Sequence, residues 1–141
     1  MVNHDYQIIA KNYDLAGRAS SRIKKYLKTQ NISKRLLKRI CSASFEAEIN
    51  VVIHSYGGYA TFDHQSDKIM IDFYDDGPGI ADIALAMTEG YSTATPLDNR
   101  NGFGAGMGLS NIKRCTDELE ITSTIEGTHL KLTFYLGEEN V

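Results

Sequence analysis

Several features are scarce in this chain of 141 residues, and each scarcity narrows the class of protein. No hydrophobic run approaches the length of about 20 residues that a membrane-spanning helix needs. The first residues contain no apolar signal-peptide core. Cysteine occurs only at Cys41 and Cys115, and neither has the spacing of a metal-ligand motif. We therefore expect a cytoplasmic protein with two free thiols and no membrane partner.

Acidic residues are absent from one long stretch, between Leu15 and Phe45, although the net charge of the chain is −3. Either a solvated helix face or a docking surface for an acidic protein explains this basic stretch. Nucleic acid is disfavoured as a partner, because the charges are not interleaved with a series of aromatic residues. Nine of the fifteen basic residues lie in the stretch, namely Arg18, Arg22, Lys24, Lys25, Lys28, Lys34, Arg35, Lys38 and Arg39.

The periodicity of the apolar residues predicts helices first and hairpin strands later. The expected helices span residues 15–30, 33–55, 80–89 and 107–116, and the expected strands span 6–10, 59–64, 68–75, 119–124 and 128–136. Ser33 is suited to cap the second helix. The apolar stripe of that helix is expected to comprise Leu37, Cys41, Phe45, Ile49, Val52 and Tyr56. This order of elements favours an α+β fold over a doubly wound parallel sheet.

Two glycine-rich segments predict a nucleotide site. An acid in a glycine turn can hold a polar heterocycle, and a glycine loop that opens a helix can hold phosphates. The second segment lacks the Lys-Ser/Thr ending of a Walker loop, and the element order does not fit a Rossmann unit. The first segment contains Asp75, Gly77 and Gly79, and the second contains Gly104, Gly106 and Gly108.

A third group of polar residues lies on the second predicted helix. Glu46, Asn50 and His54 are four residues apart, so each is displaced by about 40° around the helix axis from the last. They follow one edge of the expected apolar stripe. This position suits an acid, an amide and an imidazole that line the wall of a pocket, although such spacing alone is a weak signal.

The three groups occur in the order Glu46-x-x-x-Asn50, Asp75-x-Gly77-x-Gly79 and Gly104-x-Gly106-x-Gly108-Leu109. This order resembles the ATP-binding superfamily of gyrase, the heat-shock chaperone and histidine kinases, which has the Bergerat fold. Within it, the chain is similar to the anti-sigma regulatory serine kinases, and above all to the switch kinase of the stressosome. The resemblance covers roughly residues 15–136. It implies a single domain over 1–141, a two-layer sandwich with a mixed, mostly antiparallel sheet and helices on one face.

The resemblance also assigns roles to individual residues. Asp75 would accept a hydrogen bond from the adenine amino group of ATP, and Thr128 would support that bond through a water. Asn50 would give an oxygen to Mg²⁺, and Glu46 would be the catalytic base. The glycines of both segments would bring backbone close to the nucleotide. The other residues assigned to the nucleotide site are His54, Ser92, Thr93 and Leu109.

The function implied is that of a Mg-ATP-dependent protein serine/threonine kinase. Its substrate would be a STAS-domain protein, either an anti-anti-sigma factor or a scaffold, and a homodimer is left open. In one alternative the protein also binds a sigma factor, because the stretch 94–103 makes the lid longer than in the switch kinases. In another alternative it is a nucleotide-gated binding module without transfer activity.

Overall fold

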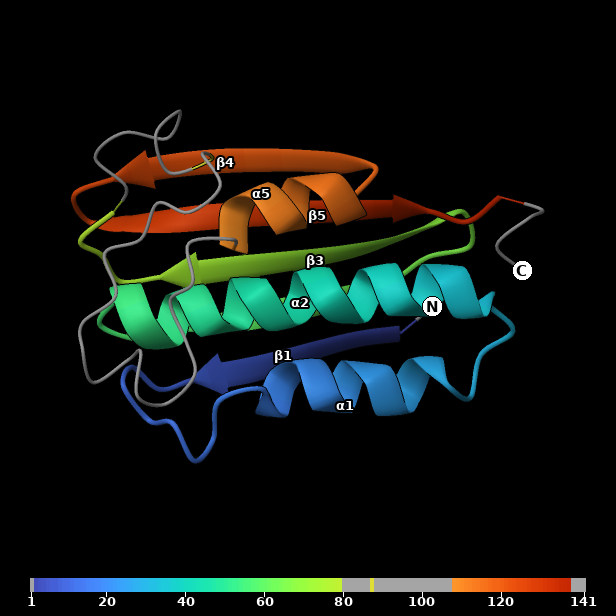
Figure 1. Ribbon diagram of the computed structural model, residues 1–141, viewed down its shortest axis with the longest axis horizontal. Coiled ribbons are helices and arrows are strands. Elements are labelled where there is room, and N and C mark those ends of the chain that lie inside the picture. Colours follow the sequence, from blue (N-terminus) through green and yellow to red (C-terminus); the bar gives the residue numbers. More distant parts are fainter. Residues whose placement is uncertain (1, 80–86, 88–107, 138–141) are drawn as a thin grey trace.

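The computed structural model describes residues 2–79, 87 and 108–137, which form two layers (Figure 1). A sheet makes up one layer and three described helices make up the other. The elements in chain order are β1 (Val2–Ile8), α1 (Arg18–Leu27), α2 (Lys34–His54), β2 (Gly58–His64), β3 (Lys68–Asp75), α5 (Gly108–Cys115), β4 (Glu118–Thr124) and β5 (Gly127–Tyr135).

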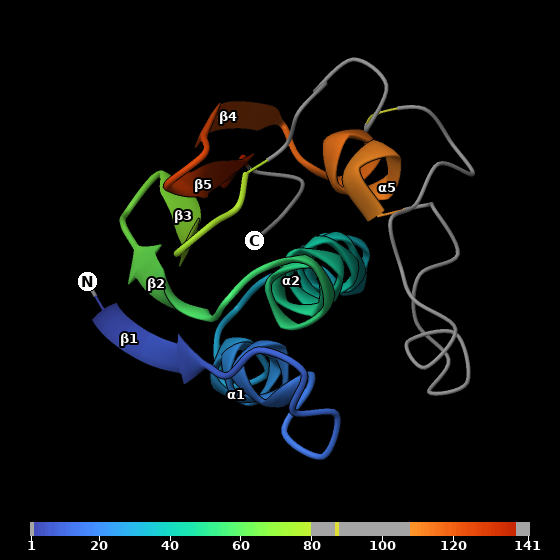
Figure 2. The same ribbon diagram turned by 90° about the vertical axis from the view of Figure 1, so that its left-hand side faces the viewer.

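The five described strands lie in the order β1-β2-β3-β5-β4, and each neighbouring pair is antiparallel. All three described helices cover the same face of this sheet (Figure 2). The α+β class, the antiparallel sheet and the single helical layer are therefore confirmed. The last strand along the chain, β5, lies between β3 and β4. This insertion brings β5 beside the end of β3, where the predicted acid of the glycine turn lies.

The hydrophobic core fills the space between the sheet and the helices. Along β2 and β3, alternate side chains are buried, as expected for strands with one covered face. Phe62, Phe73 and Phe134 point into this layer and are at most 1% exposed. Burial of one such side chain contributes about 1.5–3 kcal/mol to the stability of a fold.

Helix α2 buries a face that differs from the prediction. The predicted stripe is right at Ile49 and Val52, but Phe45 is 40% exposed, and Tyr56 lies beyond the helix and is 74% exposed. Because the sheet, α1 and α5 all pack around α2, close approach favours smaller side chains on its inner face. The centre of the buried face is Leu36, Ile40, Ala43, Ala47 and Val51.

The element boundaries agree with the sequence in most places. Ser33 caps α2 as predicted, since its hydroxyl accepts a hydrogen bond from the Leu36 N–H at 3.0 Å. The two hairpins and α5 also match their predicted ranges to within a residue or two. The first strand was expected over 6–10, but its bounds are misplaced: the strand spans Val2–Ile8, where it pairs with the whole of β2. Its polar residues conceal it from a search for apolar alternation. The helix predicted over 80–89 lies outside the described residues.

Candidate functional site

Asp75, the last residue of β3, is fixed by two backbone N–H groups. Its Oδ1 atom accepts hydrogen bonds from Gly77 at 3.0 Å and from Thr128 at 2.9 Å. Burial raises the pKa of the Asp75 carboxyl above its ordinary value, and these two hydrogen bonds oppose the rise. Among the described residues, none donates to the second oxygen, Oδ2. The carboxylate is thus held in one orientation with one acceptor atom to spare.

Thr128 supports Asp75 directly, through its backbone. The Thr128 N–H donates to the Asp75 carboxylate, a contact additional to the predicted support through a water. The Thr128 hydroxyl forms a hydrogen bond with the Ser123 hydroxyl on the neighbouring strand β4, at 2.8 Å. Thr128 is only 8% exposed, so this pair holds the start of β5 in place beneath the acid.

The turn after Asp75 needs its glycines for packing. Gly77 and Gly79 have φ angles of 106° and 88°, in the left-handed region that favours glycine. A Cβ at Gly79 would also lie 1.9 Å from the Thr124 carbonyl oxygen, in the β4–β5 hairpin. On its other side, the turn is bonded to the segment that follows α2, through Tyr56 N–H to Gly77 C=O at 3.0 Å. The turn therefore joins α2 and the sheet at the position of Asp75.

Helix α5 begins against Asn50 of α2. A Cβ at Gly108, the first residue of α5, would lie 3.0 Å from the Asn50 Oδ1 atom. The Asn111 side-chain amide donates to the Ser42 hydroxyl at 2.9 Å, so α5 lies alongside α2 with its N-terminus toward Asn50. The N-terminus of a helix attracts anions through its free N–H groups and its dipole. An amide and an anion-attracting helix end therefore meet here.

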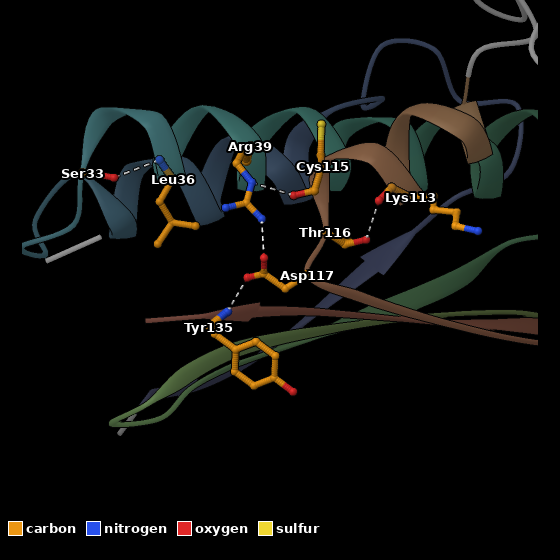
Figure 3. A network of polar contacts seen from close by, with 8 residues as sticks. All are labelled: Ser33, Leu36, Arg39, Lys113, Cys115, Thr116, Asp117 and Tyr135. Carbon is orange, nitrogen blue, oxygen red and sulfur yellow. Dashed lines mark hydrogen bonds and ion pairs between the residues drawn. The ribbon is translucent and has the colours of Figure 1, made fainter. Parts of the chain in front are cut away.

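The far end of α5 is fastened to the same helix by Arg39 (Figure 3). The Arg39 Nε atom donates to the Cys115 carbonyl at 3.0 Å, and Nη2 donates to Asp117 at 2.8 Å. Asp117 in turn accepts a hydrogen bond from the Tyr135 N–H at 2.7 Å. One of the nine basic residues thus has a structural role, linking α2 to α5 and the sheet. The cysteine beside it and Cys41 are both free, as predicted.

The three polar residues of α2 have similar surroundings. Glu46, Asn50 and His54 are each half-buried, as expected for the edge of a buried face. Burial raises the pKa of the Glu46 carboxyl, and no hydrogen bond or charge outweighs that effect. Glu46 lies one helical turn before Asn50, so the acid is displaced by about 6 Å along the axis from the amide. His54 occupies the last turn of the helix.

The remaining predicted site residues divide into two groups. Leu109 is 8% exposed and belongs to the hydrophobic core, so only its backbone is available to a ligand. Ser92, Thr93, Gly104 and Gly106 lie outside the described residues, as does the stretch 94–103 that was expected to lengthen the lid.

Sequence reasoning missed Glu48, which is buried and holds α1 in place. Its Oε2 atom accepts hydrogen bonds from the N–H groups of Gly17 and Ala19, at 3.0 and 3.1 Å, and Oε1 accepts one from Ser20 at 2.8 Å. These are orphan donors at the start of α1, where no side chain of the first turn provides a cap. The sequence signal that could have revealed Glu48 is its position: it follows Ala47 on the buried side of α2, where an acid needs hydrogen-bond donors.

Comparison with known proteins places this site in a family. The family model described as "Histidine kinase-, DNA gyrase B-, and HSP90-like ATPase" matches residues 28–139, well over half of the chain. The chain therefore belongs to this ATPase family, and membership implies that it binds ATP.

Two relatives narrow the comparison within the family. The chain is 35% identical over 106 residues to an anti-sigma F factor of Thermoanaerobacter sp. (strain X514), covering 71% of each. It is 31% identical over 103 residues to the serine/threonine-protein kinase RsbT of Bacillus subtilis (strain 168), covering 70% of this chain and 71% of the relative. The chain is similar to proteins of both names.

A solved structure supports the fold. The RsbU and RsbW domains of a protein from Mycobacterium tuberculosis superpose with a TM-score of 0.66 at 14% identity. All of this chain is covered, but only 35% of that longer chain is matched. Separately, no described helix combines the length and the apolar character that crossing a bilayer requires.

Proposed function

We propose that this protein is a Mg-ATP-dependent protein serine/threonine kinase acting on a STAS-domain protein, either an anti-anti-sigma factor or a scaffold. The observation that carries the proposal is the meeting of three groups on two helices. The start of α5 at Gly108 lies against Asn50, one helical turn after the half-buried acid Glu46. Phosphoryl transfer needs an anion-binding site, a metal ligand and a base close together. The start of α5, Asn50 and Glu46 are suited to these three roles in that order.

The described residues fit the adenine end of ATP. Asp75 keeps one carboxylate oxygen available because Gly77 and Thr128 both bind the other. A fixed acceptor of this kind suits the amino group of adenine. Partial burial strengthens the preference for a donor there, because an unpaired polar atom out of water costs free energy. Thr128 therefore acts as a positioning residue for Asp75, the acid that binds adenine.

The residues also fit the phosphate end. When bound, Mg-ATP supplies the phosphoryl group and the metal neutralises its charge. Mg²⁺ usually keeps waters and takes only one or two protein ligands beside the phosphates. The described residues contain no group of three or more His, Cys, Asp or Glu that could hold a metal ion on its own. Asn50 is the residue that we assign to the metal, and the N–H groups at the start of α5 to the phosphates.

Glu46 is the residue we assign as base. It would accept the proton of the attacking hydroxyl and orient that hydroxyl for transfer. The raised pKa of the Glu46 carboxyl makes it a stronger base than an exposed glutamate. A phosphate placed on the substrate adds about 1.5 to 2 negative charges, which is enough to switch an interface.

Transfer from labelled ATP to the STAS-domain proteins encoded beside this chain tests the proposal. Wild-type protein should label a serine or threonine on one of them. Glu46→Gln should slow transfer by about 10²–10⁴-fold, the usual worth of a general base, with ATP affinity retained. Glu120→Gln, at an exposed position on β4, is the matched control and should transfer normally. Full transfer by Glu46→Gln would refute the assignment of the base.

A second candidate function is direct binding of a sigma factor, alongside transfer. The observation that favours it is the similarity to the anti-sigma F factor at 35% identity. Capture of sigma subunits on the immobilised protein, with ATP and then with ADP, distinguishes the two. Retention of a sigma subunit makes the protein bifunctional. ATP binding with neither transfer nor sigma capture would instead make it a nucleotide-gated module.

A further inference from the structure

A shallow groove lies between α1 and α2. Its volume of about 480 Å³ falls within the range of about 300–1,000 Å³ found for sites that accept small ligands. It is therefore large enough to receive side chains of a partner. Its main lining residues are Lys24 from α1 and Lys34, Leu37, Lys38, Cys41 and Phe45 from α2.

The groove combines an apolar floor with a cationic rim. Leu37 and Cys41 are half-buried, and Phe45 is 40% exposed. Lys24, Lys34 and Lys38 are exposed around this floor. An apolar side chain flanked by carboxylates is the complement of such a surface.

The rim lysines have no counterion within the described part of the chain. None of the three forms an ion pair there, whereas the neighbouring Arg39 is paired with Asp117. The sequence between Leu15 and Phe45, which holds α1 and the first half of α2, contains no acid. The two acids of α2, Glu46 and Glu48, lie beyond this stretch, and Glu48 already accepts three backbone N–H groups. These positive charges therefore remain available to an acidic partner.

The opposite face of the molecule has the reverse character. Residues in register across a sheet share a face, and one row on the face away from the helices joins Asp5, Asp72, Lys131 and Glu120. The next row on this face adds Asp63 and Glu118. Acids therefore predominate on the uncovered face of the sheet. This asymmetry steers an acidic protein to the helical layer and away from the sheet.

The groove leads toward the proposed base. Its residues follow α2 from Lys34 to Phe45, a distance of about 16 Å at about 1.5 Å per residue. Ser42 also lines the groove, and Glu46 follows it by four residues, so these two residues lie on the same face of α2. A partner held in the groove therefore has one end beside the proposed base.

We propose that the α1–α2 groove docks an acidic segment of the phosphoacceptor protein, with one apolar side chain of that segment against Leu37, Cys41 and Phe45. This rests on the proposed function, because it specifies where the acceptor of that kinase binds. The groove gives the enzyme a recognition surface separate from the nucleotide.

Two charge-reversal variants distinguish docking in the groove from non-specific electrostatic attraction between the basic helices and an acidic partner. Lys34→Glu with Lys38→Glu changes the rim, and Lys25→Glu with Arg35→Glu makes the same change at exposed positions of the same helices outside the groove. The probe is a STAS-domain protein of the same organism, in its unphosphorylated form. The rim variant should bind it about tenfold or more weakly, the control variant within about threefold of wild type. ATP affinity should be unchanged in both.

Cysteine alkylation provides a direct footprint. Cys41 lies in the groove, while Cys115 lies at the end of α5 and serves as an internal reference. Burial raises the pKa of the Cys41 thiol, so the reaction is run at about pH 8.5 and read at each site by mass spectrometry. Excess STAS-domain protein should slow alkylation of Cys41 by about fivefold or more and leave Cys115 unchanged, because only groove contacts exclude the reagent.

The outcomes separate the two proposals. If phosphoryl transfer occurs but the rim variant binds as well as the control variant, the groove proposal is overturned and the kinase proposal stands. The same holds if transfer occurs and Cys41 remains reactive in the complex. An equal loss in both variants means diffuse attraction and also overturns the groove. Failure of the wild-type protein to bind or label any STAS-domain protein overturns both proposals.

Discussion

Gly108 lies directly against the side chain of Asn50, so that a Cβ on the glycine would be 3.0 Å from the amide oxygen. This contact joins the second glycine segment to the polar edge of α2. It sets how closely the start of α5 approaches that edge. The Asn111–Ser42 bond and the Arg39 contacts hold the rest of α5 at the same helix. A small increase in side-chain size at Gly108 should therefore displace the Asn50 side chain.

Gly108→Ala should weaken ATP binding more than it affects folding. The added Cβ forces the Asn50 amide to move by a few tenths of an ångström, while alanine favours the helix by up to about 1 kcal/mol. We expect lower ATP affinity by calorimetry with the free energy of unfolding changed by less than about 1 kcal/mol. Gly137→Ala is the control, because no heavy atom lies within 4 Å of its Cβ position. Equal ATP affinities would contradict the role of the contact.

Asp75→Asn should lose ATP binding and keep the fold. The asparagine oxygen can still accept from the N–H groups of Gly77 and Thr128, so the turn is preserved. Its amide nitrogen would then replace the remaining acceptor by a donor, which opposes the adenine amino group. We expect ATP affinity to fall by at least about tenfold, the cost of leaving a polar group unpaired. Undiminished ATP affinity would exclude this residue as the reader of adenine.

Glu48→Gln should destabilise the protein without touching the nucleotide site directly. The carboxylate uses both oxygens to accept three N–H groups at the N-cap and in the first turn of α1, whereas a glutamine offers one oxygen and directs an NH₂ group at a donor. We expect a loss of about 1–3 kcal/mol in urea unfolding. Glu120→Gln on β4 is the exposed control and should change stability by less than about 0.5 kcal/mol. A neutral result at Glu48 would show that α1 does not depend on this cap.

Glu46→Gln should stabilise the fold at neutral pH even as it removes transfer. The folded-state pKa of Glu46 is raised, so the protonated form favours folding at low pH and this contribution is lost as the pH rises through the raised value. At pH 7 the wild-type protein holds a desolvated charge that glutamine lacks. Below about pH 4.3, the ordinary pKa of glutamate, the difference in unfolding free energy between variant and wild type should be small. It should grow as the pH rises through the raised pKa of Glu46 and then level off. A pH-independent difference in unfolding free energy would rule out this explanation.

The sequence predicted the parts of the fold that depend on local pattern. The hairpin of β2 and β3 follows from its apolar alternation, and the start of α2 follows from the hydroxyl of Ser33. The glycine turn after Asp75 could also be located, because positive φ angles at Gly77 and Gly79 need residues of that type.

Contacts between distant segments could not be predicted in the same way. Glu48 caps a helix about thirty positions earlier, and nothing local to either segment specifies that pairing. The buried face of α2 was misplaced for a related reason. Periodicity gives the direction of apolar residues, but the helices packed on each side decide how large the inner residues can be. That is why Ala43 and Ala47 face inward while Phe45 remains exposed.

The hydrogen bond from Thr128 to Asp75 determines when, during synthesis of the chain, the Asp75 side chain acquires both of its donors. It joins residues 53 positions apart, and β5 is the last described strand along the chain. A chain still emerging from the ribosome, with β1 to β3 already paired, has the acid but not both of its donors. Synthesis proceeds at about 5–20 residues per second, so this interval lasts for seconds. Until Thr128 has been made and β5 has paired, a nascent chain therefore lacks one of the two donors that fix the Asp75 carboxylate.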